Sequence, residues 1–216
     1  MRNIFIVLEG CEGSGKSTQL KKLQGHLPEA VFFREPGGTE FSENEMRRLL
    51  LSKDHGPRMS AFQHMNLFFT GRADNIREIV IPAHKQGKVA LTDRFDASSF
   101  AYQIFGLGGH ELEAHFESNR AFMGPVEHRP SLYIILDIPV EVGMARVAKR
   151  ENDKKGTSNH FDTRGPDFHS RVRDGYRRFA EIHGPSVVMI DASGTVEEVW
   201  TKLRQTVDEH IASLRS

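Results

Sequence analysis

Five short runs of apolar residues are spaced along the chain, and stretches with helical spacing separate them. The runs are Ile4–Leu8, Val31–Phe33, Val89–Thr92, Leu132–Leu136 and Val187–Ile190. Each run is continuous rather than alternating, as expected for strands that are buried on both faces of a sheet. Strands that alternate with helices favour a parallel, doubly wound α/β sheet, in which ligands bind at the carboxyl ends of the strands.

Three pairs with capping-box spacing indicate helices between and after these runs. They are Ser42 with Glu45, Ser60 with Gln63, and Thr195 with Glu198. The last pair opens an apolar stripe from Val196 to Leu214, which we interpret as core packing. No repeat, low-complexity tract or flexible linker divides the chain, so we expect a single domain over residues 1–216.

The charge balance excludes a general attraction to polyanions, because 29 basic and 29 acidic residues give a formal net charge of zero. No apolar run approaches the ~20 residues of a membrane span, and we see no signal peptide. The single cysteine, Cys11, allows no internal disulfide, and the histidines lack zinc-ligand spacing. We therefore expect a cytoplasmic protein that binds neither nucleic acid nor membranes.

A phosphate-binding loop directly follows the first apolar run, where residues 10–18 read G-C-E-G-S-G-K-S-T. A strand before the motif and a helical pattern after it argue against a chance match in a glycine-rich turn. Backbone N–H groups and a helix N-terminus would hold phosphate oxygens, Lys16 would reach the β- and γ-phosphates, and Ser17 would ligate Mg²⁺. The ATP-binding residues predicted here are Gly10, Cys11, Glu12, Gly13, Ser14, Gly15, Lys16, Ser17 and Thr18.

Two acidic residues compete for a metal-binding role at strand ends. Asp93 ends the third run beside Arg94, and Asp137 ends the fourth. Asp93 is placed to bind Mg²⁺, and the guanidinium of Arg94 to bind a phosphate acceptor, although an ordinary ion pair is the simpler alternative. Because a helical pattern follows Asp137, we expect that residue to cap a helix.

Two further features are candidates for the acceptor side. Residues 34–39 read R-E-P-G-G-T, which dictates a tight turn at the carboxyl edge of the sheet. Phe68 and Arg72 stand at i and i+4 of one predicted helix and therefore share a face, where a ring and a guanidinium could bind a nucleobase. A purely structural turn and a core phenylalanine are the alternatives.

The segment Glu151–Pro166 is polar, carries both signs of charge and lacks periodicity. A solvated surface loop is its default interpretation. In a phosphotransferase, a charged segment between two helices is also where a closing lid would lie, here over about 150–166.

Several motifs together resemble those of the thymidylate kinase family, and the resemblance covers nearly the whole chain. They are F-I-V-L-E-G-C-E-G-S-G-K-S-T from Phe5, R-E-P-G-G-T from Arg34, L-F-F-T-G-R from Leu67, D-R-F-D-A-S-S-F-A-Y-Q from Asp93, L-D-I-P-V-E-V-G from Leu136 and D-F-H-S-R-V-R-D-G-Y from Asp167. The resemblance implies a P-loop nucleoside monophosphate kinase fold, with a five-stranded parallel sheet flanked by helices. It also implies a homodimer that phosphorylates dTMP to dTDP with ATP and Mg²⁺.

The resemblance assigns roles on the acceptor side residue by residue. Phe68 would stack on thymine, Arg72 would bond its O4 edge, and Ser99 would face the base. Tyr102 would crowd the sugar where a ribonucleotide carries its 2′-hydroxyl. The whole set expected to bind dTMP is Glu9, Arg34, Pro36, Phe68, Arg72, Arg94, Ser98, Ser99 and Tyr102.

The family takes a catalytic cation either from the phosphate loop or from the lid. No basic residue lies between Gly10 and Gly15, so this chain resembles the lid type. Arg150 is the first candidate, followed by Arg146 and Arg164. The predicted catalytic set is therefore Lys16, Arg94 and Arg150, with Ser17 and Asp93 as metal ligands.

Two alternative functions remain open at this point. Asp74 stands where the family commonly has Gln, which favours considering a kinase for another nucleoside monophosphate. The residues from Asp191 spell D-x-x-G, as in a P-loop GTPase or ATPase switch. That motif follows the last strand, however, and no Asn-Lys dipeptide begins a guanine-reading motif.

Overall fold

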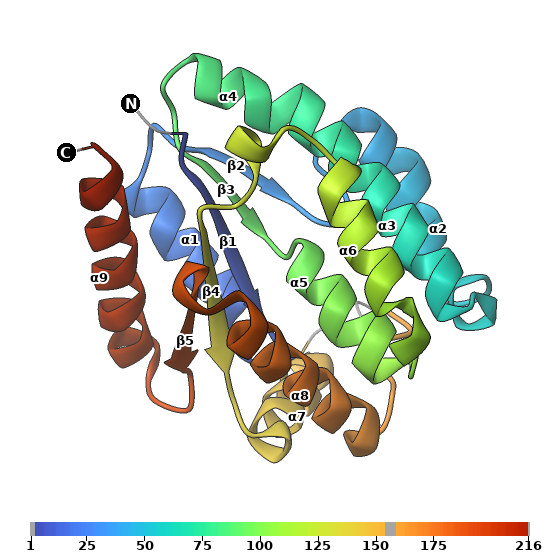
Figure 1. Cartoon of the computed structure of the whole chain (residues 1–216). Coiled ribbons are helices and arrows are strands. Elements are labelled where there is room, and N and C mark those ends of the chain that lie inside the picture. The colour runs from blue at the N-terminus through green and yellow to red at the C-terminus, as the bar shows by residue number, and fades with distance from the viewer. Residues whose placement is uncertain (1–2, 154–158, 216) are drawn as a thin grey trace.

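Five parallel strands form one sheet in the order β2-β3-β1-β4-β5 (Figure 1). The computed structural model describes residues 3–153 and 159–215, with the side chains of 150–153 left out. The strands are β1 (Phe5–Gly10), β2 (Val31–Arg34), β3 (Ala90–Asp93), β4 (Leu132–Asp137) and β5 (Val187–Asp191). Each occupies one of the predicted apolar runs, and the predicted parallel α/β fold is confirmed.

Helices cover both faces of this sheet (Figure 1). Their bounds are α1 (Lys16–His26), α2 (Arg48–Leu50), α3 (Ala61–Asn75), α4 (Ile81–Lys85), α5 (Asp96–Ser99), α6 (Glu113–Phe122), α7 (Val140–Asp153), α8 (Pro166–His183) and α9 (Val196–Arg215). More widely wound turns lead into α2 (Ser42–Arg47), join α3 to α4 (Ile76–Val80) and extend α5 (Phe100–Gly106).

Continuous apolar strands are required because each face of the sheet has its own core. Ile6 and Leu8 of β1 pack in one cluster with Leu23 of α1 and Leu203 of α9. The other face carries a larger aromatic cluster built from β1, α3, α5 and α8, which includes Phe5. Side chains alternate between faces along a strand, so every position of β1 is buried.

Two of the three predicted capping boxes are confirmed. The Ser60 hydroxyl accepts from Gln63 N at 3.2 Å while Gln63 accepts from Ser60 N, and Thr195 pairs with Glu198 in the same way. The Ser42 box is wrong, because the helical turn begins earlier. There the Thr39 hydroxyl accepts from Ser42 N at 3.1 Å, and Ser42 itself is buried.

The expected helix cap at Asp137 is also wrong. Its carboxylate accepts hydrogen bonds from Arg173 (2.7 and 3.0 Å) and from Arg177 (3.0 Å), both on α8. Asp137 therefore ties the end of β4 to a helix that is distant in sequence.

Within the described ranges, no helix is both long enough and apolar enough to cross a membrane.

Candidate active site

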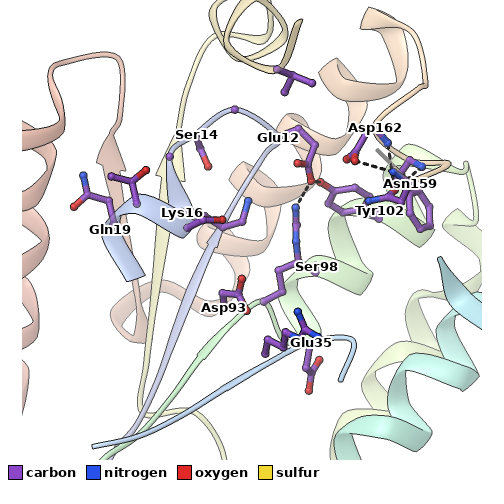
Figure 2. A pocket seen from close by; sticks show the side chains of 18 of the residues that line it. Glu12, Ser14, Lys16, Gln19, Glu35, Asp93, Ser98, Tyr102, Asn159 and Asp162 are labelled. Carbon is purple, nitrogen blue, oxygen red and sulfur yellow. Dashed lines mark hydrogen bonds and ion pairs between the residues drawn. The ribbon is translucent and has the colours of Figure 1, made fainter. Parts of the chain in front are cut away.

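A cavity of about 930 Å³ opens at the carboxyl ends of the central strands (Figure 2). Its walls come from the phosphate loop, the ends of β2 and β3, the faces of α3 and α5, part of α7, the loop from β5 to α9, and Asn159, Phe161 and Asp162. Parallel sheets place ligand sites at this edge because all their loops after strands meet there. The cavity therefore brings together segments that are widely separated in the sequence.

Glycine is required in the phosphate loop because the backbone passes close to its neighbours. A Cβ on Gly10 would lie 2.6 Å from the carbonyl oxygen of Leu136, and its φ is 144°. A Cβ on Gly13 would strike the backbone of Gly143 in α7. The loop then enters α1 at Lys16, so that the helix N-terminus faces the cavity.

Lys16 lies folded into the loop. Its Nζ donates to the carbonyl oxygens of Gly10 at 2.7 Å and Cys11 at 3.2 Å. Burial and then the nearby Arg94 lower the pKa of Lys16, while Glu12 opposes them. Phosphate oxygens are better partners for this ammonium than neutral carbonyls, so a bound nucleotide would attract it.

The two predicted metal ligands both line the cavity. The Ser17 side chain is exposed there, and Asp93 lies at the end of β3. Asp93 Oδ1 is buried and lacks a hydrogen-bond partner among the described residues, and burial raises the pKa of this carboxyl. Mg²⁺ uses one or two protein oxygens together with water and substrate phosphates, so these residues fit it. No cluster of three or more His, Cys, Asp or Glu side chains suited to a metal occurs in the described chain.

Arg94 lines the cavity and has a positive φ of 72°, which is unusual for a residue with a side chain. Its guanidinium donates to Ser98 Oγ at 3.3 Å and Tyr176 OH at 3.2 Å, and it forms an ion pair with Glu12. It also lies over the Tyr102 ring, 5.1 Å from the centroid. Strained backbone that is held by several contacts is typical of functional positions.

Glu9 is fully buried and does not line the cavity. Its carboxylate accepts from Phe95 N (2.7 Å), Ser98 Oγ (2.7 Å) and Tyr176 OH (2.9 Å). Burial raises the pKa of Glu9, and Arg94 together with these hydrogen bonds opposes that shift. In this geometry Glu9 fixes the turn after β3 that presents Arg94 and Ser98.

Arg72 and Phe68 lie on one wall, as their helical spacing predicts. The buried guanidinium of Arg72 donates to Glu35 Oε2 (2.9 Å), Ser99 Oγ (2.9 Å) and the Phe95 carbonyl (2.7 Å). Burial raises the pKa of Glu35 to about 8, and Arg72 opposes this shift. These bonds lock Arg72 in place, so that it needs no rearrangement to meet a planar ligand beside Phe68.

Arg34 and Pro36 line the cavity near its acceptor end. Arg34 is paired with Glu43, and the Pro36 carbonyl accepts from Arg47 at 2.6 Å. Arg47 also lines the cavity, although the sequence patterns did not single it out. An arginine on an irregular helical turn gives no local signal that it faces a site.

Asp74 lies outside the cavity lining. Its carboxylate accepts from the Thr39 hydroxyl and from Arg77 at 2.6 Å. Asp74 therefore holds the R-E-P-G-G-T turn against α3. Its carboxylate does not border the part of the cavity beside Phe68 and Arg72.

Glu12 has a different place from the other loop residues. Its carboxylate accepts from Arg94 and from Tyr102 OH at 3.2 Å, so it points toward the acceptor side (Figure 2). The sequence assigned Glu12 to ATP only through its position in the motif. Glu12 is the one charged residue between Gly10 and Gly15, and an acid is a poor partner for ATP phosphates, so its charge could have indicated a different role.

Of the three lid arginine candidates, Arg146 lines the cavity and Arg164 does not. The side chain of Arg150, near the end of α7, lies outside the described residues. Arg146 lines the cavity and donates to the carbonyls of Gly13 (3.3 Å) and Ala192 (3.1 Å). The guanidinium of Arg164 lies over the Phe168 ring at 5.0 Å and outside the lining.

The sequence predicted a lid over about 150–166 but singled out none of residues 159–163 as lining the site. Asn159, Phe161 and Asp162 all line the cavity. Tyr176 of α8 was quoted only as part of a motif, yet it bonds both Glu9 and Arg94. Cys11 is buried, and burial raises the pKa of its thiol to about 12.

A phosphate loop on one side of a cavity and fixed guanidinium groups on the other define a P-loop phosphotransferase of the nucleoside monophosphate kinase class. The model of the thymidylate kinase family matches residues 8–203. The chain belongs to the thymidylate kinase family.

Individual relatives support this membership, and a solved structure shares the fold. A thymidylate kinase of Acinetobacter baylyi is 34% identical over 215 residues, which cover 98% of this chain and 100% of the relative. Another, of Symbiobacterium thermophilum, is 37% identical over 211 residues, covering 96% and 94%. The crystal structure of thymidylate kinase from Ehrlichia chaffeensis has the same fold, with a TM-score of 0.72 at 24% identity and coverage of 95% and 98%.

Proposed function

We propose that this chain transfers the γ-phosphoryl group of ATP to the phosphate of dTMP, giving ADP and dTDP. The observation that carries the proposal is a single cavity lined by Lys16 of the phosphate loop and by the paired Phe68 and Arg72 of α3. Arg94 bonds Glu12 of the phosphate loop and Ser98 of α5, so it joins the side of the donor to the side of the acceptor phosphate. Family membership supports dTMP as the acceptor.

Positioning and charge neutralisation supply most of the rate in phosphoryl transfer. The loop N–H groups and Lys16 would hold the β- and γ-phosphates, while Arg94 would hold the acceptor phosphate. Phe68 would stack on the base and Arg72 would donate to its carbonyl edge. Because Arg94 and Arg72 are already fixed by neighbouring groups, little reorganisation would be needed on binding.

Ser17 and Asp93 would hold Mg²⁺ beside the phosphates. When bound, the ion would supply positive charge to the phosphate oxygens of ATP, where negative charge builds up as ADP leaves. Asp93 Oδ1 is buried and has no partner among the described residues, which supports this assignment, since a bound cation with its waters would satisfy it. Arg150 would supply further charge from the lid.

A direct assay tests the proposal. The protein is mixed with ATP, Mg²⁺ and dTMP, and ADP and dTDP are measured. Lys16→Ala should lose most of kcat with an unchanged circular dichroism spectrum, whereas Lys21→Ala, an exposed lysine on α1, should turn over normally. Failure of the wild-type protein to form dTDP, or normal turnover by Lys16→Ala, would overturn it.

We further propose the homodimer that the family resemblance implies. Exposed apolar side chains on α3 and α6, such as Phe62 and Phe122, support an interface over these two helices. Light scattering coupled to gel filtration should give twice the 24.5 kDa of one chain. A monomer at micromolar concentration would contradict this proposal.

A further inference from the structure

One histidine pair joins residues 159–163, which lie within the predicted lid, to the body of the protein. The ring of His160 stacks on that of His64 from α3, with centroids 5.4 Å apart and planes 16° from parallel. Both side chains are buried, at 6% and 0% exposure. His160 Nε2 lies 2.9 Å from the carbonyl oxygen of Leu50, at the end of α2.

The crevice that receives His160 has little spare room. A Cβ on Gly56 would strike the His160 ring, so glycine is needed where the turn after α2 passes it. The Leu50 carbonyl is an acceptor, so His160 must carry its proton on Nε2. Its Nδ1 is buried and has no hydrogen-bond partner within the described chain, so a second proton there would lack an acceptor.

The next residue connects this crevice to the cavity. The Phe161 ring lies against the His160 ring, with centroids 4.0 Å apart, and meets the Tyr102 ring edge-on, with centroids 5.6 Å apart. Phe161 is buried and lines the cavity, as does Asn159, whose Oδ1 accepts from the amides of Phe161 (2.8 Å) and Asp162 (3.3 Å). Residues 159–163 thus form a compact turn, and the side of this turn that faces Tyr102 closes the cavity.

We propose that His160 is a positioning residue for the acceptor, because its ring docks the 159–163 turn on α3 and so places Phe161 beside Tyr102. The effect on dTMP rests on the proposed function. Without the docked ring, Phe161 loses its support and the acceptor end of the cavity opens to water.

Docking depends on pH because both rings must be neutral. Burial lowers the pKa of His64 to about 4, with His160 and Arg164 acting in the same direction and the Gly56 backbone opposing. Burial also lowers the pKa of His160, with Arg164 adding to it and the Leu50 carbonyl opposing. In the undocked turn His160 has an ordinary pKa of about 6.5. Docking is therefore fully favoured above that pH and weakens as the pH falls below it.

Two measurements test the proposal together: hydrogen exchange reports the protection of residues 159–165, and titration calorimetry reports the affinity for dTMP. At pH 7.5, His160→Ala should lose protection in peptides covering 159–165 and should bind dTMP about ten-fold more weakly, because a ring stack and a hydrogen bond are removed. His160→Phe keeps a flat ring and should restore part of both. His55→Gln, an exposed histidine in the neighbouring turn, is the matched control and should behave as wild type.

The pH arm separates positioning from simple packing. Between pH 7.5 and 5.5, protection of 159–165 in the wild type should fall about ten-fold beyond the intrinsic change in exchange rate. In His64→Phe/His160→Phe, whose rings cannot be protonated, only the intrinsic change should remain.

The possible results have distinct meanings. Unchanged protection or unchanged dTMP affinity in His160→Ala would overturn the positioning role, as would a pH response that survives in the double variant. If wild-type protein bound no dTMP at all, the proposed function would fail. The exchange measurements would still decide whether His160 docks the turn.

Discussion

Glu12 of the phosphate loop forms an ion pair with Arg94, which follows β3. The pair joins the donor side of the cavity to the acceptor side, and Tyr102 contacts both members. Arg94 is thereby held in place and charge-balanced before any phosphate arrives. An acceptor phosphate would be a second anionic partner for the same guanidinium.

This arrangement predicts a specific defect for Arg94→Lys. An ammonium cannot bond Ser98, Tyr176 and a phosphate in the forked geometry of a guanidinium, so kcat/KM for dTMP should fall by roughly 100-fold. Steady-state kinetics with each substrate varied in turn should place most of the loss on dTMP. Arg178→Lys, an exposed arginine on α8, is the control. Equal losses for both substrates would contradict the acceptor role.

The lid cation is predicted from the sequence, since the side chain of Arg150 lies outside the described residues. If Arg150 meets the transferred group in the transition state, Arg150→Ala should cut kcat by ~10³–10⁵-fold with little change in dTMP affinity. Arg150→Lys should recover only part of the rate.

A comparison of lid arginines distinguishes this role from others. Arg146→Ala should mainly raise the KM for ATP, because Arg146 joins Gly13 of the phosphate loop to the loop after β5. Arg164→Ala and the exposed Arg204→Ala should retain kcat. Normal turnover in Arg150→Ala would exclude it as the lid cation.

Base preference should not depend on Asp74, because its carboxylate is bound to Thr39 and Arg77 away from the cavity. We expect dTMP to be favoured over dUMP by ~10–200-fold, which is the discrimination one methyl group provides. Cytosine presents an amine where Arg72 requires a carbonyl, so dCMP should be a much poorer substrate. Competition assays with dTMP, dUMP, dCMP and dGMP, run on wild type and Asp74→Gln, should give the same order. A changed order in the variant would show that Asp74 does act on the base.

The single cysteine should be inert in the folded protein. Burial raises the pKa of Cys11 to about 12, and the reactive species is the thiolate. Since this pKa is raised, the thiol stays protonated at pH 8, whereas the unfolded chain ionises near pH 8.5. Labelling by a disulfide reagent at pH 8 should be at least about 1000-fold slower than in guanidinium chloride. Rapid labelling of the native protein would indicate that the loop opens.

The sequence by itself determined the strands and the phosphate loop. A run such as Ile4–Leu8 must be buried on both faces whatever surrounds it, and the loop motif specifies its own backbone within nine residues. The positions of Asp93 and Arg94 at the cavity edge followed from the same reasoning, since parallel strands bring their carboxyl ends together.

Only the tertiary structure decided which partner each polar side chain has. Glu9 accepts a hydrogen bond from Tyr176, which is far away in the sequence. Asp137 pairs with α8 instead of capping a helix, and Asp74 bonds Thr39 away from the base site. His160 finds its crevice beside His64 in the same way. Burial makes these partners compulsory, because a buried charge or donor without one is costly. Which partner is available depends on how helices pack on the sheet, and no local pattern of residues encodes that packing.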